Sequence, residues 1–226
     1  MAQFQRAFFV LLFCTFALFG QHSDLDTRLF RTINNGQNPD QNGFFEFLDL
    51  SAYPSFAAVP IGFIAVGASA DNHLAVRTGI MSAMGQALTL GVSFAIKEIV
   101  ARPRPFETLE DVRVKHQWSA AGHSFPSGHS SQAFAIATVI SLSYRDPAIT
   151  IPLFLWAGAI GYGRVYLGVH YPTDVLGGMI VGVAGGFAAW SLRKEIGRIS
   201  ENFVPPDAAL RTGFSDFRLA TVRIPL

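Results

Sequence analysis

Long uncharged stretches of apolar residues dominate this chain and predict helices that cross a membrane. A helix that spans the hydrocarbon core needs about 20 mostly apolar residues, and a charge near its middle is costly. Candidate stretches without a charged residue occupy residues 7–20, 51–70, 79–96, 129–144, 148–163 and 175–192. The five from residue 51 onward predict spans, because each can extend by a turn and because Gly and Pro are tolerated in membrane helices.

The first apolar stretch allows two interpretations. Arg6 precedes a short apolar run that ends at Gly20, which is the layout of a secretory signal peptide. The same run could remain as an uncleaved first transmembrane helix. Residues 1–20 are therefore assigned to a signal peptide or to a first span, and in both cases the chain emerges on the outer side of the membrane.

Residues 21–50 form a predicted interfacial segment. Leu25, Leu29, Phe30 and Ile33 recur near helical spacing before an Asn-Asn-Gly break, and further apolar residues follow. This pattern predicts short amphipathic helices that lie in the membrane interface, with a packed loop as the alternative.

The basic residues predict which side of the membrane each loop occupies. Alternating the spans from an outside start places residues 71–77, residues 145–146 and the tail from residue 193 inside. Residues 101–128 and 164–174 then lie outside. The basic residues of the inside set are Arg6, Arg77, Arg145, Arg193, Lys194 and Arg198. This distribution agrees with the tendency of cytoplasmic loops to carry an excess of Lys and Arg.

Composition strengthens the membrane interpretation and narrows the partners. Half of the 226 residues are hydrophobic and only 15% are charged, and the mean hydropathy is +0.33, which indicates a membrane protein rather than a soluble domain. The net charge of +1 and the scattered basic residues make nucleic acid an unexpected partner. The single cysteine, Cys14, leaves no intrachain disulfide and no thiolate metal site.

Three polar clusters lie at the ends of predicted spans, and the predicted topology places all of them on the outer side. The first cluster runs from Lys97 to Pro105. Its helix has to end near Arg102, because Pro103 and Pro105 cannot continue it. Lys97 and Arg104 are then expected at the mouth of the helix.

The second cluster is the tetrapeptide Pro126-Ser127-Gly128-His129, directly before an apolar stretch. Pro and Ser favour the start of a helix, and a helix N-terminus offers backbone N–H groups to an anion. Ser127 adds a hydroxyl donor, and His129 is expected in the first helical turn, facing a bound anion.

The third cluster contains Arg164, His170 and Asp174. Residues four apart share one face of a helix, so a helix that starts near Tyr171-Pro172 lets Asp174 accept a proton from His170 and fix its tautomer. An imidazole oriented in this way keeps its other nitrogen bare and can act as a nucleophile.

Together the clusters predict a site for phosphoryl transfer. Lys97, Arg104 and Arg164 supply three positive charges to a phosphate, and the Ser127 and Gly128 amides supply further hydrogen-bond donors.

The two histidines have distinct predicted tasks. His170 attacks phosphorus, while His129 protonates the leaving oxygen and then activates the water that cleaves the phosphohistidine. No spaced set of carboxylates and histidines accompanies Glu98 or Asp111, so neither a metal ion nor another cofactor is expected.

Other polar and small residues have simpler predicted roles. The basic residues expected to be interfacial anchors are Arg102, Arg113 and Lys115. His116 and His123 are expected to be loop residues near the site or outside it. The glycines predicted to allow close packing of the last span are Gly177, Gly178, Gly182, Gly185 and Gly186.

The three ordered clusters resemble the signature motifs of the PAP2 (type-2 phosphatidic acid phosphatase) superfamily, which also includes class A acid phosphatases and vanadium haloperoxidases. The resemblance implies an all-α, multi-pass membrane bundle of five or six spans with a PAP2/haloperoxidase-like core. The catalytic domain would occupy residues 51–200, followed by a C-terminal tail over residues 201–226. One departure is visible: the third motif usually begins Ser-Arg, whereas Gly163 precedes Arg164 here. Without the serine hydroxyl, the site lacks one phosphate contact.

The resemblance also implies a membrane phosphatase whose partners are a phosphorylated lipid substrate and the surrounding membrane lipids. The expected substrates are undecaprenyl diphosphate, phosphatidate, phosphatidylglycerol phosphate or lipid A phosphate. A location in the cell (inner) membrane with the active site facing the periplasm or outside favours the first and the last of these. The alternatives are a vanadate-dependent haloperoxidase and a non-catalytic lipid-binding or flipping protein. The sequence predicts no particular oligomeric state.

Overall fold

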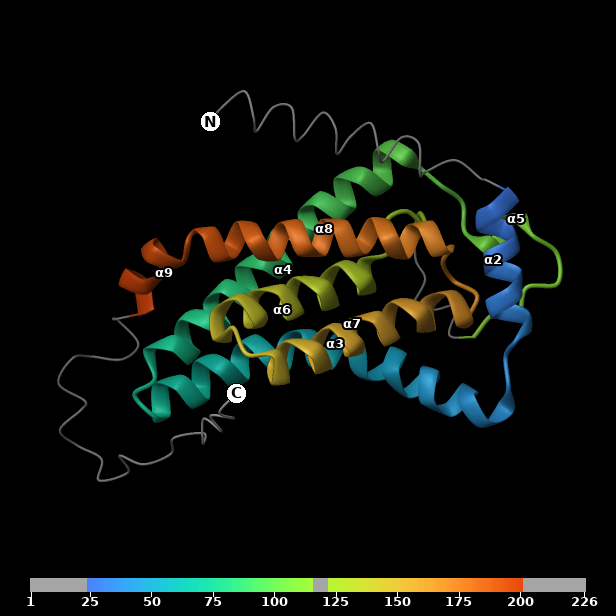
Figure 1. Ribbon diagram of the computed structural model, residues 1–226. Helices are drawn as coiled ribbons and strands as arrows, with labels where there is room; N and C mark the ends of the chain where they lie inside the picture. The colour runs from blue at the N-terminus through green and yellow to red at the C-terminus, as the bar shows by residue number, and fades with distance from the viewer. Residues whose placement is uncertain (1–23, 116–121, 201–226) are drawn as a thin grey trace, which may run out of the picture.

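The computed structural model describes residues 24–115 and 122–200, and these residues form helices and no strand (Figure 1). The predicted all-α fold is therefore confirmed for this part of the chain. The predictions for residues 1–20, for Cys14 and His116 and for the tail over residues 201–226 fall outside the described residues.

The predicted spans from residue 51 onward all lie in helices: α3 (Pro39–Ser69), α4 (His73–Val100), α6 (Gly128–Tyr144), α7 (Pro147–Tyr166) and α8 (Pro172–Ser191). Within the described residues, four segments are long and apolar enough to cross a membrane, namely Pro39–Ser69, His73–Thr108, Pro147–Tyr166 and Pro172–Ser191. The 17-residue α6 is shorter. It lies in the middle of the bundle, in contact with α3, α4, α7 and α8. The predicted number of five or six spans is not confirmed.

Helix α3 begins well before the apolar stretch that predicted it. Its N-cap is Asn38, whose side chain accepts a hydrogen bond from the Asp40 amide at 3.1 Å, and Pro39 occupies the first turn. Both features favour a helix start at this point. Pro54 and Pro60 lie inside the helix without ending it. The second half of the predicted interfacial segment is therefore continuous with the first described span.

Helix α2 (Asp24–Asn35) ends at the predicted Asn-Asn-Gly break, and the side chains it buries are polar as well as apolar. Asp26, Phe30 and Asn34 are buried, whereas Leu25 and Leu29 are 58% and 46% exposed. The buried polar side chains are bonded to distant parts of the chain, which compensates for their removal from water. The location of this helix in the membrane interface stays a prediction.

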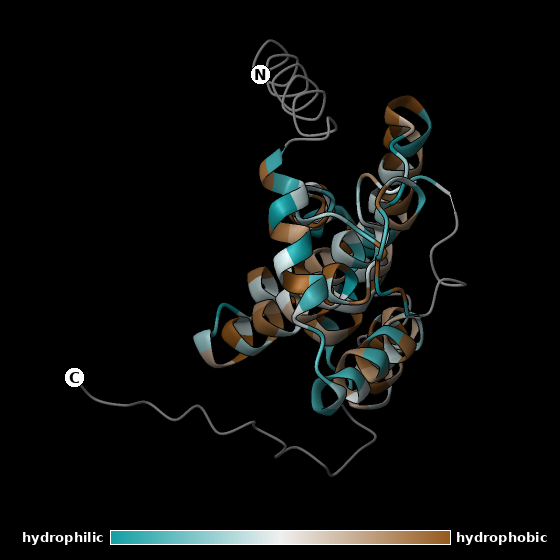
Figure 2. Ribbon diagram, turned by 90° about the vertical axis from the view of Figure 1, so that its right-hand side faces the viewer, coloured by the Kyte–Doolittle hydropathy of each residue, from teal (hydrophilic) through white to brown (hydrophobic). Residues whose placement is uncertain are grey.

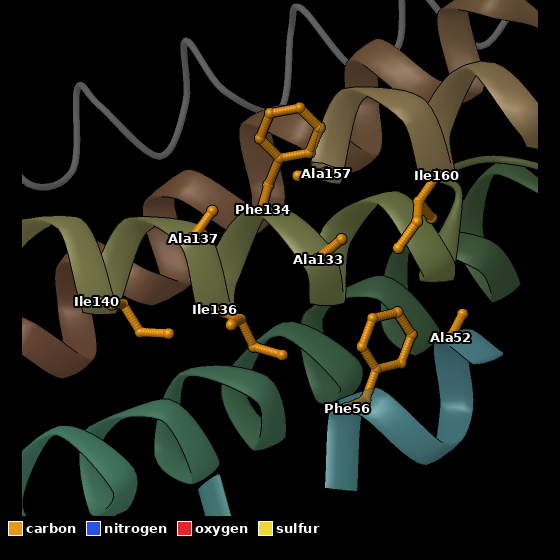
Figure 3. Packing of buried hydrophobic residues seen from close by; sticks show 9 residues of the cluster. All are labelled: Ala52, Phe56, Ala133, Phe134, Ile136, Ala137, Ile140, Ala157 and Ile160. Atoms are coloured by element: carbon orange, nitrogen blue, oxygen red, sulfur yellow. The ribbon is translucent and has the colours of Figure 1, made fainter. Parts of the chain in front are cut away.

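The core and the outer surface of the bundle are both apolar. One cluster from α3, α6 and α7 consists of Ala52, Phe56, Ala133, Phe134, Ile136, Ala137, Ile140, Ala157 and Ile160 (Figure 3). Large apolar side chains of the long helices are also exposed, including Ile61, Phe94, Leu155 and Phe187. Figure 2 shows hydrophobic residues along much of the length of these helices. Such an apolar exterior suits contact with lipid rather than with water.

Helices α6 and α8 are in backbone contact along a seam of glycines. Gly178, Gly182 and Gly186 recur every four residues on α8, and a Cβ added at Gly186 would lie 2.8 Å from the Ala135 carbonyl oxygen. A Cβ added at Gly182 would collide with the Ser131 carbonyl oxygen. The predicted close helix packing at these glycines is confirmed.

Replacing Gly182 by alanine should destabilise the bundle, because the obstacle is backbone that cannot rotate away. We expect the free energy of unfolding to fall by about 1–3 kcal/mol, the usual range for overpacking. Thermal unfolding in detergent measures the change. Gly158→Ala on α7 is the matched control, since a Cβ there meets nothing within 4 Å, and alanine favours a helix more than glycine does. Equal midpoints of thermal unfolding for Gly182→Ala and Gly158→Ala would contradict close backbone packing at Gly182.

Candidate active site

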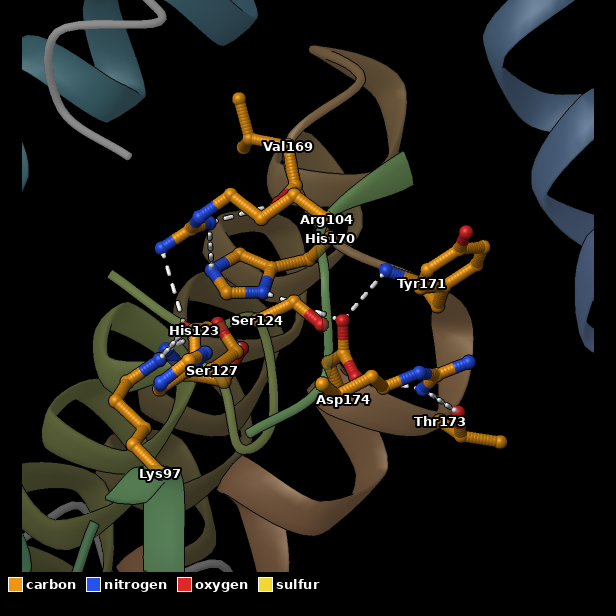
Figure 4. Close-up of polar contacts among 12 residues, drawn as sticks. Lys97, Arg104, His123, Ser124, Ser127, Val169, His170, Tyr171, Thr173 and Asp174 are labelled. Atoms are coloured by element: carbon orange, nitrogen blue, oxygen red, sulfur yellow. Dashed lines mark hydrogen bonds and ion pairs between the residues drawn. The ribbon is translucent and has the colours of Figure 1, made fainter. Parts of the chain in front are cut away.

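The three sequence clusters converge at one end of the bundle. Lys97 lies in the last turn of α4, Ser127 caps α6, and Arg164 lies in the last turn of α7. The third cluster continues through the α7–α8 connection to Asp174 in the first turn of α8. The clusters are joined directly: the Ser127 amide donates to the Asp174 carbonyl at 2.9 Å. Figure 4 shows how the side chains of this end face one another.

His170 lies between an acid and a cation. Its Nδ1 is 3.4 Å from Asp174 Oδ2, and its Nε2 is 3.3 Å from Arg104 Nη1 (Figure 4). The Asp174 oxygen also accepts the Tyr171 amide at 2.8 Å, as α8 begins. With the proton on Nδ1, directed at the carboxylate, the lone pair of Nε2 faces the guanidinium of Arg104. That nitrogen is therefore the one that can attack a phosphate held by the arginine.

Burial lowers the pKa of His170 well below its ordinary value, and the positive charges of Arg104, Arg164 and Lys97 lower this pKa further. His170 lies in the connection between α7 and α8, and its side chain is 2% exposed. Burial and nearby cations both disfavour the imidazolium form. Both effects favour the neutral ring, which is the form that nucleophilic attack requires.

Arg102 is buried and holds Asp174 in place. Its Nη1 lies 2.7 Å from Asp174 Oδ1, its Nη2 lies 2.6 Å from Asp26 Oδ2, and all three side chains are at most 1% exposed. The prediction that Arg102 is an interfacial anchor is therefore wrong, because two carboxylates hold its guanidinium inside the protein. Thr173 closes the network by donating its hydroxyl to Asp26 at 2.6 Å.

The two other predicted anchors lie nearer the surface. Arg113 is exposed, and Lys115 is 40% exposed and 3.1 Å from Glu46. Within the described residues, neither side chain forms a hydrogen bond to a residue around His170. Of the three predicted anchors, only Arg102 therefore supports the site.

Backbone carbonyls hold two of the predicted phosphate-binding cations. Arg104 donates to the carbonyls of Gly122 at 2.9 Å and Val169 at 2.8 Å. Lys97 donates to the His123 carbonyl (Figure 4). His123 therefore contributes its main chain here. A phosphate that reaches this position would replace neutral carbonyl oxygens with charged ones, which form stronger hydrogen bonds to both cations.

The cap of α6 changes one prediction. Ser127 is the N-cap, as the Pro-Ser start predicts, but its amide is engaged with the Asp174 carbonyl and is no longer available to a phosphate. The Ser127 hydroxyl oxygen accepts from the Ser130 hydroxyl at 3.1 Å, which leaves its own proton to donate. Ser127 and Gly128 thus retain a hydroxyl and a first-turn position beside the site, and the Ser127 amide is removed from the predicted donors.

Asp49 of α3 is a site residue that the sequence did not identify. Arg164 Nη1 donates to Asp49 Oδ1, and the same oxygen lies 3.8 Å from His129 Nε2. The Asp49 side chain is 1% exposed. The one available signal was a carboxylate inside the apolar run of residues 47–50, where an acid is unexpected unless it is paired.

Gly163, the departure from the usual third motif, makes room for α3. A Cβ added at Gly163 would lie 3.2 Å from Phe45 Cδ1, so a serine would crowd this ring. Phe45 precedes Asp49 by one helical turn and packs on Tyr166 with ring centroids 4.5 Å apart. The missing side chain therefore allows α3 to approach the end of α7 where Arg164 lies.

A phosphate that binds Arg164 has to compete with the Asp49 carboxylate. Asp49→Asn, which removes the charge and keeps the shape, should therefore lower KM for a phosphate substrate and Ki for inorganic phosphate. We expect about tenfold, or about 1.4 kcal/mol. Steady-state kinetics checks this, with Glu46→Gln on the same helix as the control. An unchanged KM with a reduced kcat would instead assign Asp49 to the positioning of His129.

Comparison with known proteins identifies the family. Residues 79–198, which hold all three clusters, match the PAP2 superfamily. The chain belongs to the PAP2 superfamily. This membership confirms the resemblance drawn from the sequence motifs.

Relatives of this PAP2 chain are phosphatases of membrane lipids. Undecaprenyl-diphosphatase BcrC of Bacillus subtilis is 28% identical over 167 residues, which are 72% of this chain and 81% of that protein. Lipid A 4'-phosphatase of Bacteroides thetaiotaomicron is 31% identical over 115 residues, covering 46% of this chain and 50% of that protein. The crystal structure of Aquifex aeolicus LpxE is 32% identical with a TM-score of 0.62, over 75% of this chain and 96% of that one. The chain is thus a multi-pass membrane phosphatase of the PAP2 type.

Proposed function

We propose that this PAP2 phosphatase hydrolyses a lipid phosphate or lipid diphosphate through a phosphohistidine on His170. The observation that carries the proposal is the orientation of the ring, with Nδ1 toward Asp174 and Nε2 toward Arg104. Lys97 and Arg164 add positive charge close enough to lower the pKa of His170. A group of cations around a neutral, oriented imidazole favours attack on a phosphorus atom that carries anionic oxygens.

The reaction would proceed in two displacements. His170 Nε2 forms a bond to phosphorus while the bond from phosphorus to the leaving oxygen breaks, and His129 supplies the proton that this oxygen needs. His129 then takes a proton from a water molecule whose oxygen attacks the phosphohistidine. The phosphorus–nitrogen bond breaks and releases inorganic phosphate. His129 Nε2 is buried without a hydrogen-bond partner among the described residues, which suits a group that exchanges its proton with the substrate.

The substrate is proposed to be a lipid because the site lies at the ends of apolar helices. A headgroup can reach this end of the bundle from the membrane interface while its acyl or prenyl chains stay beside the helices. Relatives are named for action on undecaprenyl diphosphate, on lipid A and on phosphatidylglycerophosphate. Among these, the outward-facing site proposed below favours undecaprenyl diphosphate and lipid A.

A panel of these four lipids, scored by release of inorganic phosphate, tests the proposed function. We expect the purified protein to prefer undecaprenyl diphosphate or lipid A to glycerol 3-phosphate, a soluble ester without chains, and to keep its activity in EDTA. In the described residues no three His, Cys, Asp or Glu side chains gather at one point. Equal turnover of the soluble ester would argue against a lipid substrate, and loss of activity in EDTA would require a metal in the mechanism.

The site is proposed to face the outer side of the cell membrane, from the distribution of basic residues. Cys14 is first replaced by serine, and a single cysteine is then placed at Glu110, an exposed residue near the site, or at His73, an exposed residue at the opposite end of α4. In intact cells, a maleimide that cannot cross the membrane should label position 110 at once and position 73 only after permeabilisation. The reverse pattern would place the site in the cytoplasm.

A further inference from the structure

A polar cavity lies at the end of the bundle opposite the candidate active site. Its volume is about 340 Å³, and its lining residues are Arg77, Met81, Leu142, Ser143, Arg145, Trp190, Arg193 and Lys194. These residues come from the start of α4, the ends of α6 and α8 and the start of α9 (Arg193–Ser200). The candidate active site uses the other ends of α4, α6 and α8, and α8 alone is about 30 Å long at 1.5 Å per residue. The cavity is therefore a separate site.

Four positive charges line this cavity, and no acidic residue does. The two nearest carboxylates in the sequence are engaged elsewhere: Asp146 caps α7 by accepting from the Ala148 amide at 2.8 Å, and Glu195 pairs with Arg198 at 2.9 Å. Within the described part of the chain, none of the four lining cations has an ion pair. Like charges gathered around one space repel each other, so an anion that enters the cavity relieves this repulsion.

The shape and chemistry of the lining indicate which anion fits. Arg77 Nε is buried without a hydrogen-bond partner among the described residues. Arg193 stacks on the Trp190 ring at 3.8 Å, which fixes its guanidinium at the rim. Arginines that are held in place present paired N–H donors to the oxygens of a phosphate. Met81 and Leu142 add apolar wall beside these donors.

The position of the cavity distinguishes a lipid from a soluble phosphate. Arg77, Arg145 and Arg193 lie at the ends of helices whose outer faces are apolar, where phospholipid headgroups meet the protein. Basic pockets between membrane helices bind anionic headgroups in this position. We propose that this cavity binds the headgroup phosphate of an anionic phospholipid, in the leaflet opposite the candidate active site.

Retention of lipid by the purified full chain tests the proposal. Native mass spectrometry in detergent compares dioleoyl phosphatidylglycerol with dioleoyl phosphatidylcholine, which has the same chains and a phosphate but no net charge. We expect at least about tenfold stronger retention of phosphatidylglycerol, equivalent to about 1.4 kcal/mol. The Arg77→Gln/Lys194→Gln variant should lose this preference. Its turnover of a short-chain phosphate ester should stay unchanged, because the active site lies at the other end.

Matched controls separate a built site from general attraction of anions. Arg198→Gln changes the net charge on the same helix at an exposed residue outside the cavity, and it should retain phosphatidylglycerol. Lys194 is exposed, so Lys194→Gln alone decides the outcome if the double variant unfolds, and Lys194→Arg should restore retention.

Two results would overturn the proposal. One is equal retention of the two lipids, or an equal loss in Arg198→Gln, which would reduce the cavity to a diffuse positive surface. The other is displacement of phosphatidylglycerol by inorganic phosphate or glycerol phosphate at equal concentration, which would assign the cavity to a soluble phosphate.

Discussion

Replacing His170 by alanine should reduce phosphate release by about four to six orders of magnitude, the range seen when a catalytic nucleophile is removed. No other described side chain has a neutral nitrogen directed at Arg104 and held from behind by a carboxylate. The loss should appear in kcat, because Arg104, Lys97 and Arg164 remain to bind the substrate. Release of inorganic phosphate from the preferred lipid measures the effect.

Trapping the intermediate distinguishes covalent catalysis from a purely structural role of His170. Wild-type protein quenched during turnover of a substrate with a labelled phosphate should carry label that is lost in acid and kept in alkali, as expected for a phosphorus–nitrogen bond. His170→Ala should carry none. His73→Ala is the control, since His73 is an exposed histidine at the far end of α4. Full turnover by His170→Ala would contradict the covalent mechanism.

Replacing Arg102 by alanine should have the largest effect on stability. The change leaves Asp26 and Asp174 buried without the guanidinium that lies 2.6 Å from one and 2.7 Å from the other. Removing one partner of a buried ion pair destabilises by about 3–5 kcal/mol. Activity should also fall, because Asp174 then loses the contact that holds it beside His170.

Thermal unfolding and kcat, measured on the same preparation, check this prediction. Arg113→Ala is the control, since Arg113 is an exposed arginine of the same connection and should unfold close to the wild type. Arg102→Lys should recover only part of the stability, because an ammonium group lacks the planar fork that reaches both carboxylates. An Arg102→Ala protein as stable as Arg113→Ala would show that the ion pairs contribute nothing net.

The sequence predicts the local features of the site well because local residues determine them. Helix α4 ends at Val100, just before the prolines at positions 103 and 105. Helix α6 begins at Gly128 after its cap Ser127, and helix α8 begins at Pro172. Caps and prolines determine these ends within a few residues. The helix start at Pro172 brings His170 and Asp174, which are four residues apart, into contact.

The partners from distant parts of the chain could not be predicted. Asp26 and Asp49 meet Arg102 and Arg164 across 76 and 115 residues, and one sequence without its fold gives no reason to pair them. The same limit applies to Asp26 and Asn34 of α2, which are buried although they are polar. A carboxylate or amide side chain can be buried when it forms hydrogen bonds inside the protein. Hydropathy alone therefore does not predict which residues of such a helix are buried.

The glycine seam has a consequence for how a substrate enters. Helices α6 and α8 touch through their backbones, and they carry His129 at one N-terminus and Asp174 at the other, with His170 two residues before α8. This backbone contact joins the helix starts beside the two histidines into one packed unit. Asp49 belongs to α3, which meets this unit through side chains such as Phe56. The His129 ring also packs on Tyr53 and Phe56 of α3, with ring centroids 4.6 and 6.1 Å apart. A displacement of α3 that frees Arg164 for a phosphate would therefore also release the ring of the proton donor, which couples admission of substrate to the alignment of His129.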